Sequence, residues 1–302
     1  MRIPIPEMDE RFSCTEDAVE HIIRICNVIV DKARVVFPNS SITDIPGYVL
    51  EFCRKVLMQA ATLVKVAREE KDYNTVCSLV RILADNMAIL QVVYNCQKEE
   101  EKILRHFLYV LDGVSQRYEY LKDCRMSYDG RIPKETFVAL MRQVQGAKNN
   151  AVDCIKMCDD AIKKLPIYAA HNNEIDALIR KRNWKFKQVD PFHEKDKNAY
   201  SWKEMYGMLE IRDISNIMSY FSQYVHGLSI SNIGLGDPDD FDAPLSFSFC
   251  LLGWLYNYLN KEYVPHIGEY TMEDIDKMAP GLIDAIIARK IKNEAQWAGE
   301  FR

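Results

Sequence analysis

The segment from Asn74 to Gln97 constrains the fold of this chain more than any other feature of the sequence. It carries only two charged residues, Arg81 and Asp85, and its apolar residues repeat with the period of an α-helix. When the segment is projected as a helix, apolar side chains such as Ile82 and Val92 also cover the side opposite the main stripe. A helix that is apolar nearly all round is buried among other elements. We therefore predict a central helix in an α-helical core.

Further amphipathic segments predict helices on both sides of this one. We expect them at residues 15–36, 45–70, 98–124, 133–165, 172–184, 201–230, 243–262 and 272–298. The chain has only 12 Gly and 11 Pro among 302 residues, which favours long helices with few turns. Strand patterns are weak throughout. The predicted fold class is all-α, a multi-helix up-and-down bundle of about eight to nine helices.

A chain of 302 residues is compatible with one large helical domain, and we expect a single domain over residues 1–302. The segment 187–200 is polar and irregular. A division at this segment is the alternative, with an N-terminal bundle over 1–186 and C-terminal helices over 200–302.

Composition limits the cellular setting and the partners. The formal net charge of −5 argues against attraction of the whole surface to nucleic acid or to an anionic membrane. Nine cysteines, an odd number, are scattered through apolar helical patterns, as expected for reduced thiols in the cytoplasm. No stretch of about 18 uncharged apolar residues is present. We expect a soluble cytoplasmic protein without a membrane partner.

Arg81 and Asp85 lie one helical turn apart on the predicted central helix. Burying either charge alone is costly, so each needs a partner. One interpretation is a structural ion pair within the bundle. The other is a polar site inside the bundle, because buried charges also concentrate at functional sites.

A second polar face is predicted on the helix over 201–230. Arg212, Ser215, Ser219, Ser222 and His226 recur at helical spacing beside its apolar stripe. Arginine and hydroxyl donors can hold a phosphate or a carboxylate, and histidine can exchange a proton near neutral pH. The alternative is structural, since serines at this spacing let two helices approach closely.

The remaining chemical signals are short. The run Arg180–Lys187 holds five basic residues and two aromatic ones, a mixture that suits single-stranded nucleic acid or simply a solvated helix end. Neither the aspartates of 237–242 nor the pair Cys154 and Cys158 has the pattern of a metal site. There is no glycine-rich phosphate loop. No metal and no cofactor are expected.

Two motifs together resemble a bacterial and phage family of all-helical proteins of unknown function. They are Arg81-Ile82-Leu83-Ala84-Asp85 and Phe221-Ser222-Gln223-Tyr224-Val225-His226-Gly227, within a region of similarity over about residues 50–230. Asp85 stands where the family has Glu, and Phe221 where it has Leu. The resemblance implies that Arg81, Asp85, Ser222 and His226 converge in one internal cleft. The family is distantly similar to HEPN-type helical bundles, many of which are ribonucleases, although the arginine that those bundles carry shortly before the histidine is missing here.

Two functions follow as hypotheses. The first is a binding or accessory protein, with a defence-related role implied by the resemblance, whose polar cleft recognises a small anionic ligand or a protein partner. Arg212, Ser219 and Ser222 would bind this ligand. The alternative is a metal-independent ribonuclease, with His226 as general acid or base, Arg81 stabilising the phosphorane and Asp85 orienting one of them. RNA would then be the substrate, and a homodimer remains an open alternative.

Overall fold

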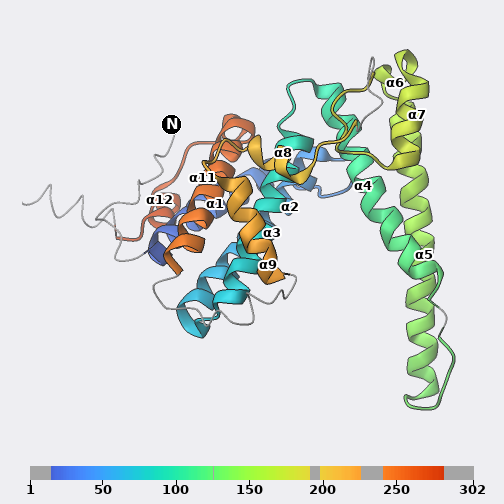
Figure 1. The fold of residues 1–302 in the computed structure, drawn as a ribbon, viewed down its shortest axis with the longest axis horizontal. Helices are drawn as coiled ribbons and strands as arrows, with labels where there is room; N and C mark the ends of the chain where they lie inside the picture. Colours follow the sequence, from blue (N-terminus) through green and yellow to red (C-terminus); the bar gives the residue numbers. More distant parts are fainter. Residues whose placement is uncertain (1–14, 125, 191–197, 226–240, 282–302) are drawn as a thin grey trace, which may run out of the picture. The chain divides into compact units, whose positions relative to one another are not determined.

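The computed structural model describes residues 15–124, 126–190, 198–225 and 241–281. Within these residues it contains eleven α-helices, nine of them with seven residues or more, and no strand, which confirms the predicted all-α fold (Figure 1). The helices are α1 (Thr15–Val36), α2 (Ile45–Lys65), α3 (Tyr73–Ile89), α4 (Glu99–Lys122), α5 (Lys134–Lys163), α6 (Pro166–Ala170), α7 (Asn172–Lys181), α8 (Trp202–Gly207), α9 (Ile214–Val225), α11 (Asp242–Glu262) and α12 (Met272–Met278).

Most helix ends lie where the sequence predicts them. The first turn of α2 is capped by Asp44, whose carboxylate accepts a hydrogen bond from the Gly47 backbone N–H at 3.2 Å. Pro46 fits in this turn because the first helical N–H groups need no intrahelical partner. Two helices end in π-helical turns, α2 through Val66–Glu70 and α3 through Leu90–Tyr94.

The prediction of one helix over 201–230 is wrong within the described residues. The structure has the short helix α8, then a break, then α9. Glu210 and Asp213 adopt left-handed backbone conformations, with φ of 56° and 57°, which a right-handed helix cannot include. The prediction over 272–298 is confirmed only for α12, and residues beyond 281 lie outside the described part of the chain.

The described helices fall into two compact units, one within Met1–Met87 and Leu209–Arg302 and the other within Ala88–Met208. In the first unit, α1 packs against α2, α11 and α12, so the helix near the C-terminus of the described chain returns to the first one (Figure 1). Val19, Ile22 and Ile29 of α1 are fully buried there. Whether residues 1–302 form one domain, or divide at 187–200, stays a prediction.

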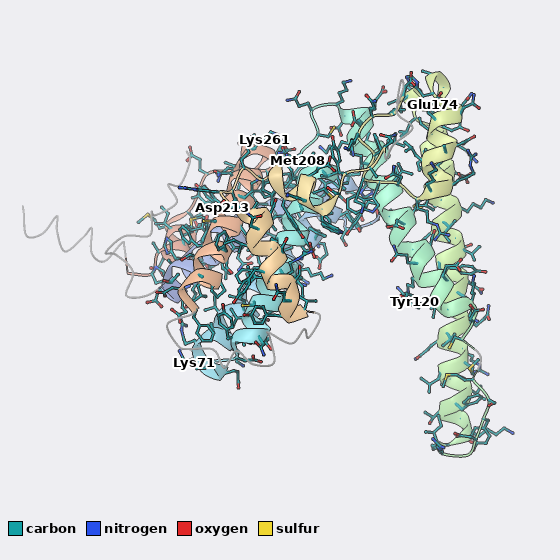
Figure 2. All side chains as sticks on the ribbon, viewed as in Figure 1. Lys71, Tyr120, Glu174, Met208, Asp213 and Lys261 are labelled. Atoms are coloured by element: carbon teal, nitrogen blue, oxygen red, sulfur yellow. The ribbon has the colours of Figure 1, made fainter. Side chains whose placement is uncertain are left out.

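In the second unit, α4 and α5 pack side by side as a helical hairpin (Figure 1). Leu104, Leu108 and Leu111 of α4 are buried, whereas Tyr120 near its end is 83% exposed (Figure 2). The short helix α6 contacts both hairpin helices and α7. This arrangement places α4 at the centre of the unit.

The segment Tyr73–Tyr94 is long and apolar enough to cross a membrane by length and composition alone, and 56% of its most apolar window is buried inside the protein. A buried core helix passes the same test. The predicted central helix is thus largely buried, with Val76, Leu83 and Met87 fully covered. The expected absence of a membrane partner and the cytoplasmic location stay predictions.

Candidate functional site

Arg81, Asp85 and Ser222 lie together between α3 and α9. The Arg81 Nε donates a hydrogen bond to the Ser222 Oγ at 2.8 Å, and its Nη1 pairs with the Asp85 carboxylate. The Arg81 and Asp85 side chains are 16% and 31% exposed. The Ser222 hydroxyl in turn donates to the Met218 carbonyl one helical turn earlier, at 2.7 Å. The guanidinium is therefore held by contacts within the protein, as a pin between two helices.

A tyrosine cluster lies in the same unit, also between α3 and α9. The Tyr73 and Tyr224 rings meet edge to face, and the Tyr220 and Tyr224 hydroxyls are 2.6 Å apart. Burial raises the pKa of Tyr73, and burial together with the hydrogen bond between the Tyr220 and Tyr224 hydroxyls raises the pKa of Tyr224. These phenols stay neutral at physiological pH and serve as hydrogen-bonding groups.

Two of the other predicted site residues, Ser219 and Arg212, are exposed. The exposed Ser219 donates its hydroxyl to the Ser215 carbonyl at 2.8 Å, which is ordinary back-bonding within a helix. The Arg212 side chain is 95% exposed, beside Asp213 (Figure 2). His226 lies outside the described residues. Among the described residues, no group of three or more His, Cys, Asp or Glu side chains could hold a metal ion.

A second polar system, which the sequence did not predict, lies on α4 in the other unit. Arg105 has only 5% of its side chain exposed, and its Nε and Nη2 both donate to Glu101, at 3.2 and 2.7 Å. Its Nη1 donates to the Trp184 carbonyl at 3.3 Å, and the guanidinium carbon lies 3.9 Å from the centroid of the Phe186 ring. One buried cation thus fastens the segment after α7 to α4.

The aromatic and the basic residues of the run Arg180–Lys187 have different surroundings in the structure. Phe186 is fully buried and Trp184 is 6% exposed, with its indole N–H donated to Asp112 at 3.2 Å. Lys185 and Lys187 alternate with them and remain half-buried. The aromatic residues of this run therefore belong to the core, and the cations are left near solvent.

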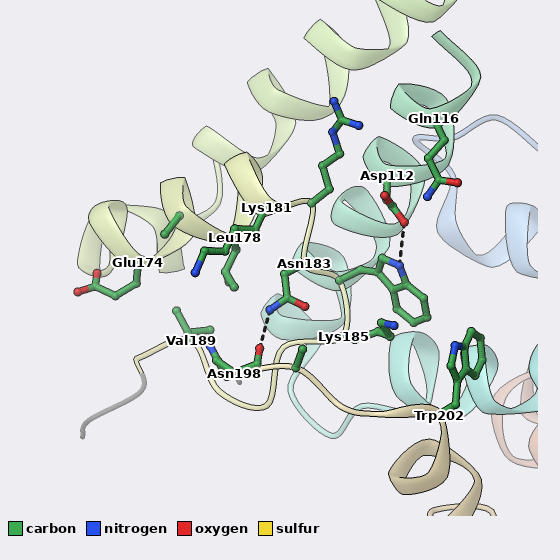
Figure 3. A pocket seen from close by; sticks show the side chains of 14 residues that line it. Asp112, Gln116, Glu174, Leu178, Lys181, Asn183, Lys185, Val189, Asn198 and Trp202 are labelled. Carbon is green, nitrogen blue, oxygen red and sulfur yellow. Dashed lines mark hydrogen bonds between the residues drawn. The ribbon is translucent and has the colours of Figure 1, made fainter. Parts of the chain in front are cut away.

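A cleft of about 820 Å³ opens beside this segment (Figure 3). Asp112 and Gln116 of α4, residues of α7 and the segments 182–189 and 198–202 form its walls. Its size falls in the range of small-molecule sites, about 300–1,000 Å³. Three cations, Lys181, Arg182 and Lys185, line it against two carboxylates, Asp112 and Glu174.

Asn198 holds the two segments that form one wall of the cleft. Its side-chain oxygen accepts from the backbone N–H groups of Lys187 and Gln188 at 3.0 and 3.1 Å. Its backbone carbonyl accepts from the Asn183 side-chain amide at 2.5 Å (Figure 3). These bonds fix the wall in place without using charged side chains.

The Lys185 ammonium lies over two indole rings, 5.6 Å from the Trp184 centroid and 5.4 Å from that of Trp202. Trp202 also stacks on Tyr206, with 30° between the rings. Such contacts stabilise a cation by about 0.5–2 kcal/mol without forming an ion pair. Lys185 therefore keeps its charge available inside the cleft.

Sequence reasoning noticed the cations of this cleft but missed its α4 side. A signal was present, because Glu101, Arg105, Asp112 and Gln116 recur on one face of the helix. The partner, Trp184, lies 72 residues beyond Asp112 in the chain. Nothing in local spacing identifies a contact at that separation.

No protein-family model matches the sequence, and no curated protein and no solved structure has significant similarity to it. The resemblance described above thus rests on its two motifs, and no family is assigned.

Proposed function

We propose that this chain is a binding protein that takes a small anionic ligand into the cleft of the Ala88–Met208 unit. One observation carries the proposal: Lys181, Arg182 and Lys185 line the cleft, and none of them lies within salt-bridge distance of a described carboxylate, the Arg182 charge acting on Glu119 only from farther away. Of the two carboxylates that line it, Asp112 already accepts a hydrogen bond from the Trp184 indole. An anion entering the cleft meets cations that form no salt bridge, in a partly enclosed, less polarisable space where charge attraction is stronger than in bulk water.

The backbone conformation of Arg182 also supports anion binding in the cleft. This residue ends α7 in the left-handed region, with φ of 52°, a position where glycine or asparagine is usual. A side chain there costs about 1 kcal/mol relative to glycine. An arginine at a position with this left-handed backbone fits a role for its guanidinium in the cleft.

The test is calorimetric titration of the full chain with pyrophosphate at low ionic strength. Arg182→Gly removes the guanidinium and relieves the backbone, so the variant should be at least as stable as the wild type and bind pyrophosphate about tenfold or more weakly. Arg180→Ala is the matched control, since Arg180 is an exposed cation of α7 that does not line the cleft. Absence of saturable binding, or equal losses in the two variants, would refute the proposal.

A metal-independent ribonuclease is the second candidate. The observation in its favour is that Arg81 contacts both Asp85 and Ser222. The defence-related role has no support beyond the family resemblance. The assay compares the purified chain with its His226→Ala variant on single-stranded and structured RNA, each with and without EDTA. Cleavage that is lost in the variant and unaffected by EDTA would support the activity, and no cleavage by either protein would refute it for these substrates.

A further inference from the structure

The cleft joins its cations to an aromatic surface, which bears on what kind of anion it takes. Trp184 and Trp202 both line it, together with the apolar side chains of Ala177, Leu178 and Val189. A site for a simple inorganic anion needs hydrogen-bond donors but no aromatic or apolar surface. The combination fits a ligand that carries a planar ring as well as a negative charge.

The two indoles do not contribute equally. Trp184 is buried against α4 and edge-packed on Tyr109, so most of its surface is already covered. Trp202 is half-buried, stacked on Tyr206, and has the Lys185 ammonium over its ring. Trp202 is thus the ring against which an incoming planar group can pack.

We infer that the cleft binds a nucleoside phosphate, with the base against Trp202 and the phosphate between the cations of the lining. The inference rests on the proposed function and adds the chemical class of its ligand. On binding, the Lys185 ammonium leaves the indole for the phosphate, which attracts a cation more strongly than an aromatic ring does. The base takes the space over the ring, where base–aromatic stacking replaces the cation–π contact.

The polar side chains of the lining suit the edge of a base. Gln116 presents an amide group, which can both donate and accept as the Watson–Crick edge of a base requires, whereas the Asn183 amide already donates to the Asn198 carbonyl. The Gln116 side chain is exposed and forms no hydrogen bond with another described residue. It is free to contact a ligand without breaking an existing bond.

The test compares two probes that differ only by a nucleoside, ADP and pyrophosphate, titrated into the full chain under the same conditions. We expect ADP to bind about tenfold or more tightly, because stacking of the base adds to the charge attraction. A single-stranded RNA of ten adenylates distinguishes a free nucleotide from an RNA strand as the source of the same chemistry. Tighter binding of the RNA than of ADP supports the inference with RNA as the ligand.

Variants of Trp202 test whether the base packs against this indole ring. Trp202→Leu should weaken ADP binding about 5- to 150-fold and lower the ratio of ADP to pyrophosphate affinity toward one, whereas Trp202→Phe should keep most of the ADP affinity. Trp254→Phe is the control, since Trp254 stacks on Tyr258 in the other unit. Circular dichroism verifies that each variant is folded, and the ADP to pyrophosphate ratio of the wild type tests the inference even when a variant is not.

The outcomes separate the two proposals. Equal affinities for ADP and pyrophosphate would overturn the nucleoside inference and leave anion binding in place. Loss of both ligands in Trp202→Leu, with the fold retained, would also overturn the placement of the base. Binding of none of the probes would overturn both proposals.

Discussion

Arg105 offers the sharpest test of what holds the cleft together. In Arg105→Met the side chain keeps much of its packing over the Phe186 ring but loses its charge and all its hydrogen bonds. The Glu101 carboxylate, 21% exposed, is left without the cation that donates two hydrogen bonds to it in the native protein. The Trp184 carbonyl loses the donor that fastens it to α4.

The expected cost follows from these contacts. Removing one partner of a buried ion pair destabilises a protein by about 3–5 kcal/mol. Because water reaches the Glu101 carboxylate in part, the lower end of that range applies, and the lost hydrogen bond to the carbonyl adds about 1 kcal/mol. We expect Arg105→Met to lower the unfolding free energy of this unit by about 3–4 kcal/mol. The double variant Glu101→Gln with Arg105→Met leaves no buried charge unpaired and should recover about half of that loss.

The measurement must resolve one unit from the other, so hydrogen exchange of peptides from α4 and α7 under native conditions is the suitable assay. Peptides of α1 and α11 serve as the internal control and should keep their protection. A loss below about 1 kcal/mol in the single variant would show that Arg105 does not hold this unit together. A double variant as unstable as the single one would show that the stranded carboxylate is not the cause.

Three further predictions concern other parts of the chain. Gly47→Ala places a methyl group 1.7 Å from a backbone carbonyl oxygen and should lower the unfolding free energy by about 2 kcal/mol or more. Gly146→Ala meets no atom within 4 Å and should raise the unfolding free energy by about 0.5–1 kcal/mol, and thermal unfolding compares the two variants. Arg81→Ala should destabilise by about 1–2 kcal/mol in urea unfolding, because the Asp85 carboxylate loses its ion pair with the guanidinium and the Ser222 hydroxyl loses a donor. No loss of stability would contradict a role of Arg81 in joining α3 to α9. The hydrogen bond from Lys187 lowers the pKa of Glu204 from 4.5 to about 2, so this contact stabilises α8 above pH 4.5 and is lost as the pH falls toward 2. Exchange protection of α8 should follow that pH window and become insensitive to it in Glu204→Gln.

Local patterns explain which parts of the fold were predictable. The bounds of α1, the capped start of α2 and the burial of the segment after Tyr73 all follow from apolar period and helix ends, which are properties of neighbouring residues. The break before α9 was missed because its apolar period continues past it. Two left-handed residues, Glu210 and Asp213, decide the break. Aspartate adopts this conformation more often than most residues but also occurs widely in helices, and glutamate rarely adopts it, so the residue types alone do not predict the break.

The same distinction applies to the site. The pairing of Arg81 with Asp85 is an i, i+4 contact and could be predicted from spacing. The contact of Arg81 with Ser222 spans 141 residues and was expected only from the resemblance to a family. Exposure of Arg212 could not be predicted, because the polar face drawn through it assumed one unbroken helix.

The run Arg180–Lys187 shows how tertiary contacts decide between two meanings of one pattern. Basic and aromatic residues in alternation suit either a stacking surface for bases or a solvated helix end. Contacts with α4 bury Trp184 and Phe186, which removes them as stacking surfaces, and they leave Lys185 at the cleft. The ring that a base could use is then supplied by Trp202, which lies 15 residues beyond the run in the sequence. The charge and the aromatic surface therefore meet only in the folded protein. Because Arg105 donates a hydrogen bond to the Trp184 carbonyl, this buried cation of α4 holds the segment that carries Lys185 in place beside Trp202.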